Sequence, residues 1–185
     1  MTNRTLNKNM LAGFIVIIIV VAGIITIIFT PFIIREWTVT GDDYKYQTFF
    51  YGYWNLYKDG VIISEGGSGT LTNFPIFSLV LIIIGLVSSF ILVPSLGFSL
   101  NRGDRYFKHF REVFSILVII CGIIGLAGTL LQIPFVAYLK SLHAETKYSI
   151  GFIFATIYFS LIIISGILLD IFIRLNKKKS SSDIN

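Results

Sequence analysis

The sequence predicts an α-helical membrane protein: a four-transmembrane-helix bundle with a small antiparallel β-sheet in the first extracellular loop. The first observation is composition, since 55% of the 185 residues are hydrophobic and the mean hydropathy is +0.81, too apolar for an ordinary soluble domain. The second is that four long apolar runs each exceed the about 20 residues that a helix needs to cross a bilayer. The expected spans are residues 10–34, 75–100, 113–139 and 148–173.

The positions of Lys and Arg predict the orientation of these spans. Ten of them lie in the N-terminal tail (1–9), the loop 101–112 and the C-terminal tail (174–185), whereas the loops 35–74 and 140–147 hold five. Because positively charged residues collect on the cytosolic side, we expect both tails and the loop 101–112 in the cytosol and the other two loops outside. This topology predicts a multi-pass membrane protein with both termini in the cytosol.

The N-terminal run and the net charge admit alternative interpretations. The first apolar run of about 25 residues is longer than the core of a signal peptide, and no small-residue cleavage site closes it, so we expect a retained signal anchor. The net charge of +5 comes from basic residues beside the spans, where topology and anionic lipids explain them. We therefore expect the lipid bilayer as a partner, and no nucleic acid.

The segment from Trp37 to Ser64 differs from the four runs and predicts the sheet. It is rich in β-branched and aromatic residues, which favour strands, and the dipeptide Asp59-Gly60 is a strong signal for a tight hairpin turn. At least three antiparallel strands are expected. Their expected ranges are 37–40, 44–57 and 61–64, with turns at 41–43 and 59–60.

The central part of this segment is unusually aromatic. Eight of the fourteen residues from Tyr44 to Tyr57 are aromatic, against 15% in the whole chain. In an extended strand every second residue falls on the same face. One face then carries Tyr44, Tyr46 and Trp54, and the other carries Lys45, Gln47, Phe49, Tyr51 and Tyr53. The stripe predicts either packing against the helix ends and headgroups or a protein-recognition surface, and we favour packing.

These features together resemble the superfamily of claudins, peripheral myelin protein and epithelial membrane proteins. Its first extracellular loop carries a Trp, then Gly-Leu-Trp, then two cysteines; here Trp37 follows the first span, and Gly52, Tyr53 and Trp54 follow at about the family spacing. The sequence YSIGF at 148–152 is similar to the family's entry into the fourth span. The resemblance implies a first-loop sheet that mediates contacts at the cell surface.

One departure from the family pattern affects the stability of the sheet. Both family cysteines are absent, and Tyr57 occupies the place of the first. The only cysteine, Cys121, lies in the middle of the third span, so the chain can form no disulfide within itself. Aromatic cross-strand packing must then replace a bond that is typically worth about 2–4 kcal/mol.

Small residues in the third span predict close helix packing. Gly122, Gly125 and Gly128 recur at every third position and drift slowly around one helix face. Such a row serves either packing within the bundle or an oligomerisation face, and we favour packing within the bundle.

The spans contain few polar groups, which argues against a pump or a secondary transporter. Asp170 lies near the cytosolic end, where an i,i+4 pair with Arg174 would neutralise it. Gln132, near the outer end of the third span, is expected to hydrogen-bond a neighbouring helix.

No catalytic, cofactor-binding or metal-binding set is visible, because His109 and His143 fall on opposite sides of the membrane and no catalytic motif occurs. We therefore expect no enzyme and no cofactor.

The leading hypothesis is a claudin-like protein with a structural role, in which the outer sheet contacts a second copy. The alternative is an accessory subunit that modulates another membrane protein such as a channel. A third class is a pore lined by the loop acids Asp42, Asp43, Asp59 and Glu65, which we instead expect to form the solvated rim of the sheet.

Overall fold

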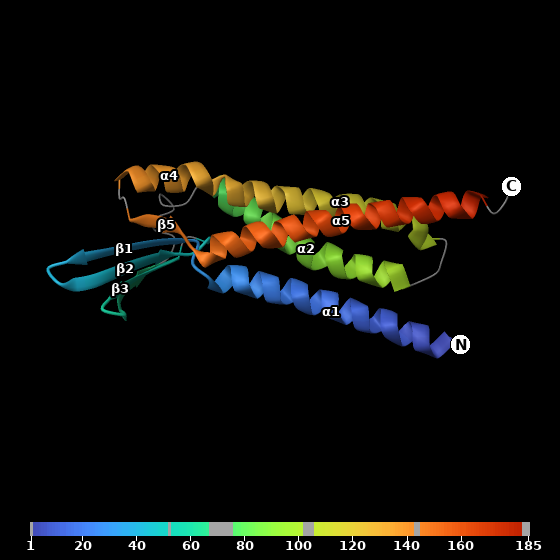
Figure 1. Cartoon of the computed structure of the whole chain (residues 1–185), viewed down its shortest axis with the longest axis horizontal. Helices are drawn as coiled ribbons and strands as arrows, with labels where there is room; N and C mark the ends of the chain where they lie inside the picture. Colours follow the sequence, from blue (N-terminus) through green and yellow to red (C-terminus); the bar gives the residue numbers. More distant parts are fainter. Residues whose placement is uncertain (1, 52, 67–75, 102–105, 143–144, 183–185) are drawn as a thin grey trace.

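The computed structural model describes residues 2–51, 53–66, 76–101, 106–142 and 145–182. Figure 1 shows long helices lying side by side, with the sheet at one end and the first turn of α1 and the last turn of α5 at the other. The helices are α1 (Thr2–Phe29), α2 (Ile76–Asn101), α3 (Tyr106–Leu130), α4 (Gln132–Leu142) and α5 (Ile150–Ser182). The strands are β1 (Ile33–Val39), β2 (Asp42–Thr48), β3 (Trp54–Lys58), β4 (Val61–Gly66) and β5 (Thr146–Tyr148).

Three stretches of helix are long and apolar enough to cross a membrane: Ile76–Val93, Glu112–Leu142 and Ile150–Leu175. In α1 the apolar stretch among the residues with described side chains, Ile17–Phe29, is shorter. The outward side chains of these helices are also apolar; Phe77, for example, is 68% exposed. Such a surface is unfavourable in water and is the one that helices in lipid present.

The first and third expected spans end differently from the sequence-based prediction, and proline explains both. α1 ends at Phe29 and not at residue 34, because Pro31 has no N–H for the next helical bond and disfavours helix at the residue before it. The third span breaks after Leu130, whose carbonyl would need an N–H from Pro134. Beyond the break α4 continues to Leu142 and lies beside the sheet (Figure 1).

The glycines of α3 lie against neighbouring helices of the same chain. A Cβ on Gly122 would lie 2.6 Å from Cγ1 of Ile163 in α5, and one on Gly128 would lie 2.9 Å from the backbone N of Ile82 in α2. Gly125 lies beneath the buried ring of Phe159. The Ser78 hydroxyl also donates a hydrogen bond to the Gly128 carbonyl at 2.6 Å. Close backbone approach therefore joins α2, α3 and α5.

The sheet has five antiparallel strands in the order β4-β3-β2-β1-β5. Its two tight turns have positive φ at both central residues, Thr40 and Gly41 in one and Asp59 and Gly60 in the other. This is the backbone of two-residue hairpins, so the turn expected at 59–60 is confirmed. The turn expected at 41–43 begins one residue earlier, because Asp42 and Asp43 are already part of β2.

The single long strand expected over residues 44–57 is wrong. β2 ends at Thr48, and the chain reverses so that the Phe49 amide donates to the Tyr53 carbonyl at 2.8 Å. The cause is burial: Phe49 and Phe50 are 9% and 5% exposed, and the Phe50 ring lies 5.8 Å from that of Phe32. The loop between β2 and β3 thus inserts Phe49 and Phe50 into the core, whereas its Tyr51 is 38% exposed.

The strand β5 was not predicted, because its three residues are too few to carry an alternating pattern. It lies in what was expected to be the loop 140–147 and the start of the fourth span, and it pairs with β1. The chain then enters α5 at Ile150. Residues far apart in the sequence therefore close one side of the sheet.

Backbone hydrogen bonds around Phe32 fix the sheet to the helices. The Phe32 amide donates to the Thr48 carbonyl at 2.8 Å, and the Phe32 carbonyl accepts from the Ser149 amide at 2.9 Å. The Gly151 amide donates to the Pro31 carbonyl at 3.0 Å, and Phe32 itself is fully buried. The end of α1, the end of β2 and the start of α5 therefore meet at one point.

Replacing Gly128 with Ala is expected to lower the apparent melting temperature in detergent by several degrees. The new Cβ would meet the backbone of α2, which cannot move as a side chain can, and overpacking of this kind costs about 1–3 kcal/mol. Ala127→Leu on the exposed side of α3 is the matched control and should change little. Equal melting temperatures for Gly128→Ala and the wild type would contradict the close packing.

Candidate functional site: the faces and edge of the sheet

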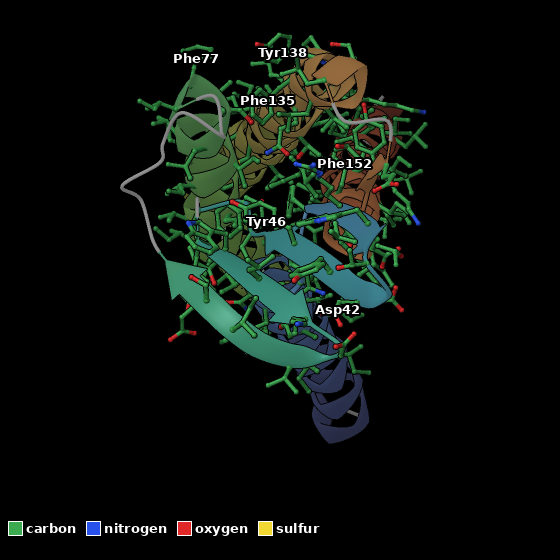
Figure 2. All side chains as sticks on the ribbon, turned by 90° about the vertical axis from the view of Figure 1, so that its left-hand side faces the viewer. Asp42, Tyr46, Phe77, Phe135, Tyr138 and Phe152 are labelled. Atoms are coloured by element: carbon green, nitrogen blue, oxygen red, sulfur yellow. The ribbon has the colours of Figure 1, made fainter. Side chains whose placement is uncertain are left out.

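The alternation of side chains gives the sheet two chemically different faces. We call one the aromatic face; it carries Arg35, Trp37, Tyr44, Tyr46 and Trp54. We call the other the ionic face; it carries Glu36, Lys45, Tyr57 and Lys147. In Figure 2, which looks onto the sheet end of the molecule, Tyr46 lies between the strands and the helices that carry Phe135 and Phe152.

Ring stacking across strands organises the aromatic face. Trp37 and Tyr44 are direct partners in the register and stack with their ring centroids 5.7 Å apart and 9° between planes. Tyr46 and Trp54 stack at 5.6 Å, and the Arg35 guanidinium lies 4.6 Å from the centroid of Trp37. Each such contact is worth about 0.5–1.5 kcal/mol, so together they approach the range expected for the missing disulfide.

The first-loop residues that resemble the claudin pattern do not lie together in space. Trp37 and Trp54 lie on the aromatic face, but on different strands with β2 between them. Tyr57 lies on the ionic face opposite Lys45. Tyr53 belongs to the loop before β3, where its hydroxyl donates to Glu65 at 2.7 Å and thereby raises the tyrosine pKa. Gly52 lies outside the described residues.

A three-strand ion network crosses the ionic face. The Glu36 carboxylate on β1 lies 3.0 Å from Lys147 Nζ on β5 and 3.2 Å from Lys45 Nζ on β2. Hydrogen bonds from Lys147 first, and then from Lys45, lower the pKa of Glu36. Sequence reasoning missed this network, because it depends on β5 lying beside β1.

The four acids considered as pore-lining groups all have partners within the sheet. Asp42 pairs with Lys58 at 2.6 Å, which raises the pKa of the lysine. Asp43 accepts from the Thr38 hydroxyl at 2.8 Å, and Asp59 accepts from the Asp43 amide at 2.9 Å. Glu65 accepts the hydroxyl of Tyr53. These carboxylates act as links between strands.

Strand β4 forms an exposed apolar edge of the sheet. It is the last strand in the order, and its outer edge pairs with no strand in the part of the chain that the structure describes. Val61, Ile62 and Ile63 are 66%, 48% and 51% exposed. The register shifts between Leu56 and Tyr57, so Ile63 is the extra residue of a bulge.

Of two polar residues in the helices, Asp170 has the partner that the sequence predicts and Gln132 does not. Asp170 pairs with Arg174 at 2.8 Å, which confirms the predicted i,i+4 contact. The prediction for Gln132 is wrong: its amide is fully buried, and neither amide atom has a hydrogen-bond partner among the described residues. The nearby hydroxyl of Thr129 is already used, because it donates to the Gly125 carbonyl of its own helix.

Among the described side chains, no group of three or more His, Cys, Asp or Glu residues could hold a metal ion. Cys121 is buried as a free thiol. The side chain of His109 and the whole of His143 lie outside the described part of the chain. Comparison with known protein families, with curated proteins and with solved structures gives no match.

The ion network predicts a pH-dependent stability. Because the pKa of Glu36 is lowered by folding, its contribution is present above the ordinary carboxyl pKa of about 4.3 and is lost as pH falls through the folded value. Glu36→Gln should therefore lower the melting temperature at pH 7, and its difference from the wild type should shrink below about pH 4.

The exposed Glu145→Gln is the control for this experiment, since Glu145 forms no ion pair among the described residues. Melting curves in detergent between pH 7 and pH 3 provide the measurement. A difference between Glu36→Gln and the wild type that is independent of pH would be inconsistent with the network.

Proposed function

We propose that this protein is a claudin-like, four-span protein of the plasma membrane with a structural role, and that its extracellular sheet joins it to a second copy. The proposal is supported by three kinds of observation: the apolar helices, a sheet joined by backbone hydrogen bonds to their ends, and an exposed apolar strand at the edge of that sheet. The sheet is the part of the molecule that can reach a partner in water.

The proposed topology has α1, α2, α3 with α4, and α5 as the four crossings. The first turn of α1 and the last turn of α5 lie at the same end (Figure 1), which an even number of crossings requires. Because Lys and Arg are concentrated in the tails and in the loop 101–112, we assign this end to the cytosol. The sheet then lies outside the cell.

The observation that carries the function is the outer edge of β4, which pairs with no strand among the residues that the structure describes. An unpaired strand edge is a template for another strand, and proteins that do not use such an edge usually place charges or proline along it. Here the three consecutive residues Val61, Ile62 and Ile63 are apolar and exposed. The bulge at Ile63 and the charge of Glu65 shorten the segment that can pair, which limits the partners that fit.

A second copy is the partner that this edge fits best. Two β4 strands related by a two-fold axis would bring the same apolar patch together from both sides, as in most dimers of identical subunits. The acids that a pore would need are engaged within each sheet. A structural contact therefore explains the surface better than a conduction pathway does.

Substitution on the edge tests the proposal. Ile63→Lys should lower the dimer fraction in membrane vesicles at least several-fold, because it places a charge in the centre of the patch. Val39→Lys is the matched control: Val39 is 49% exposed against 51% for Ile63 but lies at the end of β1. Single-molecule photobleaching of a labelled chain gives the subunit count.

A monomeric wild type, or an equal effect of both substitutions, would rule out the β4 contact. An affinity purification in mild detergent provides the second arm. Recovery of one stoichiometric heterologous membrane protein, without self-association, would replace the proposal with the role of an accessory subunit.

A further inference from the structure

A cavity of about 200 Å³ lies between the aromatic face of the sheet and α4. Arg35 lies in its wall, together with Ile33 and Trp37 of the same strand and Leu139 of α4. In the register Arg35 stands directly opposite Tyr46 on one side and Thr146 on the other, and both of these also line the cavity. The cationic group is thus flanked by two hydroxyl-bearing residues.

Arg35 has no anionic partner among the residues that the structure describes. Its Nε–H is buried and donates no hydrogen bond within the described part of the chain, and no ion pair joins Arg35 to a carboxylate there. The adjoining carboxylate, Glu36, points to the opposite face and is held by two lysines. The undescribed segments 67–75 and 143–144 contain no Asp or Glu.

An unpaired buried donor on a charged group is costly, and its cost is removed when an anion takes up the hydrogen bonds. The guanidinium is planar and presents a fork of donors that matches a phosphate or a carboxylate. Trp37 covers one side of this fork at 4.6 Å, which orients it within the cavity. The N–H groups of the Arg35 guanidinium can therefore hydrogen-bond a bound anion without a large rearrangement of the side chain.

The cavity lies at the boundary between the apolar helices and the polar sheet. Ile33 is the first residue of β1 and lies only a few residues beyond the end of α1. The hydrogen bond from the Ser149 amide to the Phe32 carbonyl places this end of β1 beside the start of α5. The walls combine aliphatic side chains with Trp and Tyr, the composition typical of the depth at which lipid headgroups lie. An anion bound here would be close to the membrane surface.

We propose that this cavity binds a phosphate group of a membrane phospholipid, with the phosphate oxygens on the Arg35 guanidinium and the Thr146 hydroxyl as a further donor. The glycerol and upper acyl carbons would lie along Ile33 and Leu139. Lipid binding depends on the placement of the helices in the membrane, as proposed above, and not on contact between copies through β4. Lipid binding and association through β4 can therefore each be disproved without the other.

Binding is measured on the full chain in a non-ionic detergent by native mass spectrometry, with phosphatidylglycerol as the probe. The wild type should retain one lipid, and Arg35→Gln should weaken its binding at least tenfold. Lys147→Gln is the matched control, because Lys147 is a cation on the neighbouring strand that faces the other way, and its affinity should equal that of the wild type. Equal loss in both variants would show attraction by surface charge alone and overturn the site.

Leu139→Trp provides a second variant that leaves all charges unchanged and fills the cavity from α4. Leu139→Trp should abolish lipid binding, and this result can be obtained even if Arg35→Gln does not fold. Wild-type affinity for the lipid in Leu139→Trp would contradict the proposal. Inorganic phosphate alone is the third arm and should compete only weakly. Competition as strong as that of the lipid would overturn the membrane source of the phosphate.

Discussion

The backbone hydrogen bonds around Phe32 are the contacts on which the rest of the structure depends. The last carbonyl groups of a helix have no partner within the helix, and where side chains exclude water other parts of the chain must supply one. Here the chain leaving α1, the end of β2 and the start of α5 satisfy one another. A Cβ on Gly151 would lie 2.5 Å from the Pro31 carbonyl, so this position needs a glycine. The sheet therefore continues the helices without a flexible linker on this side.

This junction determines what each part of the sheet can do. It directs the aromatic face toward α4, where ring stacking and the Arg35 contact hold the strands without a disulfide. It brings β5 beside β1, so that Glu36 can bridge three strands. It also leaves β4 at the far edge of the sheet, exposed and apolar. The surface proposed for association therefore lies at the edge of the sheet opposite β5.

The sequence was sufficient for features that depend on local pattern and insufficient for those that depend on long-range contact. Apolar length identified the helices, and Asp59-Gly60 identified a hairpin. The strand boundaries were misjudged because Ile33 and Ile34 are as apolar as the helix before them, and because Phe49, Phe50 and Tyr51 are residues that favour strands but lie in a loop. The three-residue β5, and with it the ion network, gave no signal. The cavity could have been suspected only from Arg35 and Trp37, which are two residues apart and therefore on one face.

The central claim is that β5 pairs with β1 in a defined register and so fixes the sheet to the helices. The most direct test is disulfide formation between Ile34→Cys and Lys147→Cys, a register pair, in a background that carries Cys121→Ser. We predict rapid and nearly complete formation of this disulfide in the membrane, and none for the pair Thr38→Cys and Lys147→Cys, which share a face but not a register position. Equal crosslinking of both pairs, or none of the first, would contradict the pairing and the attachment of the sheet that it produces.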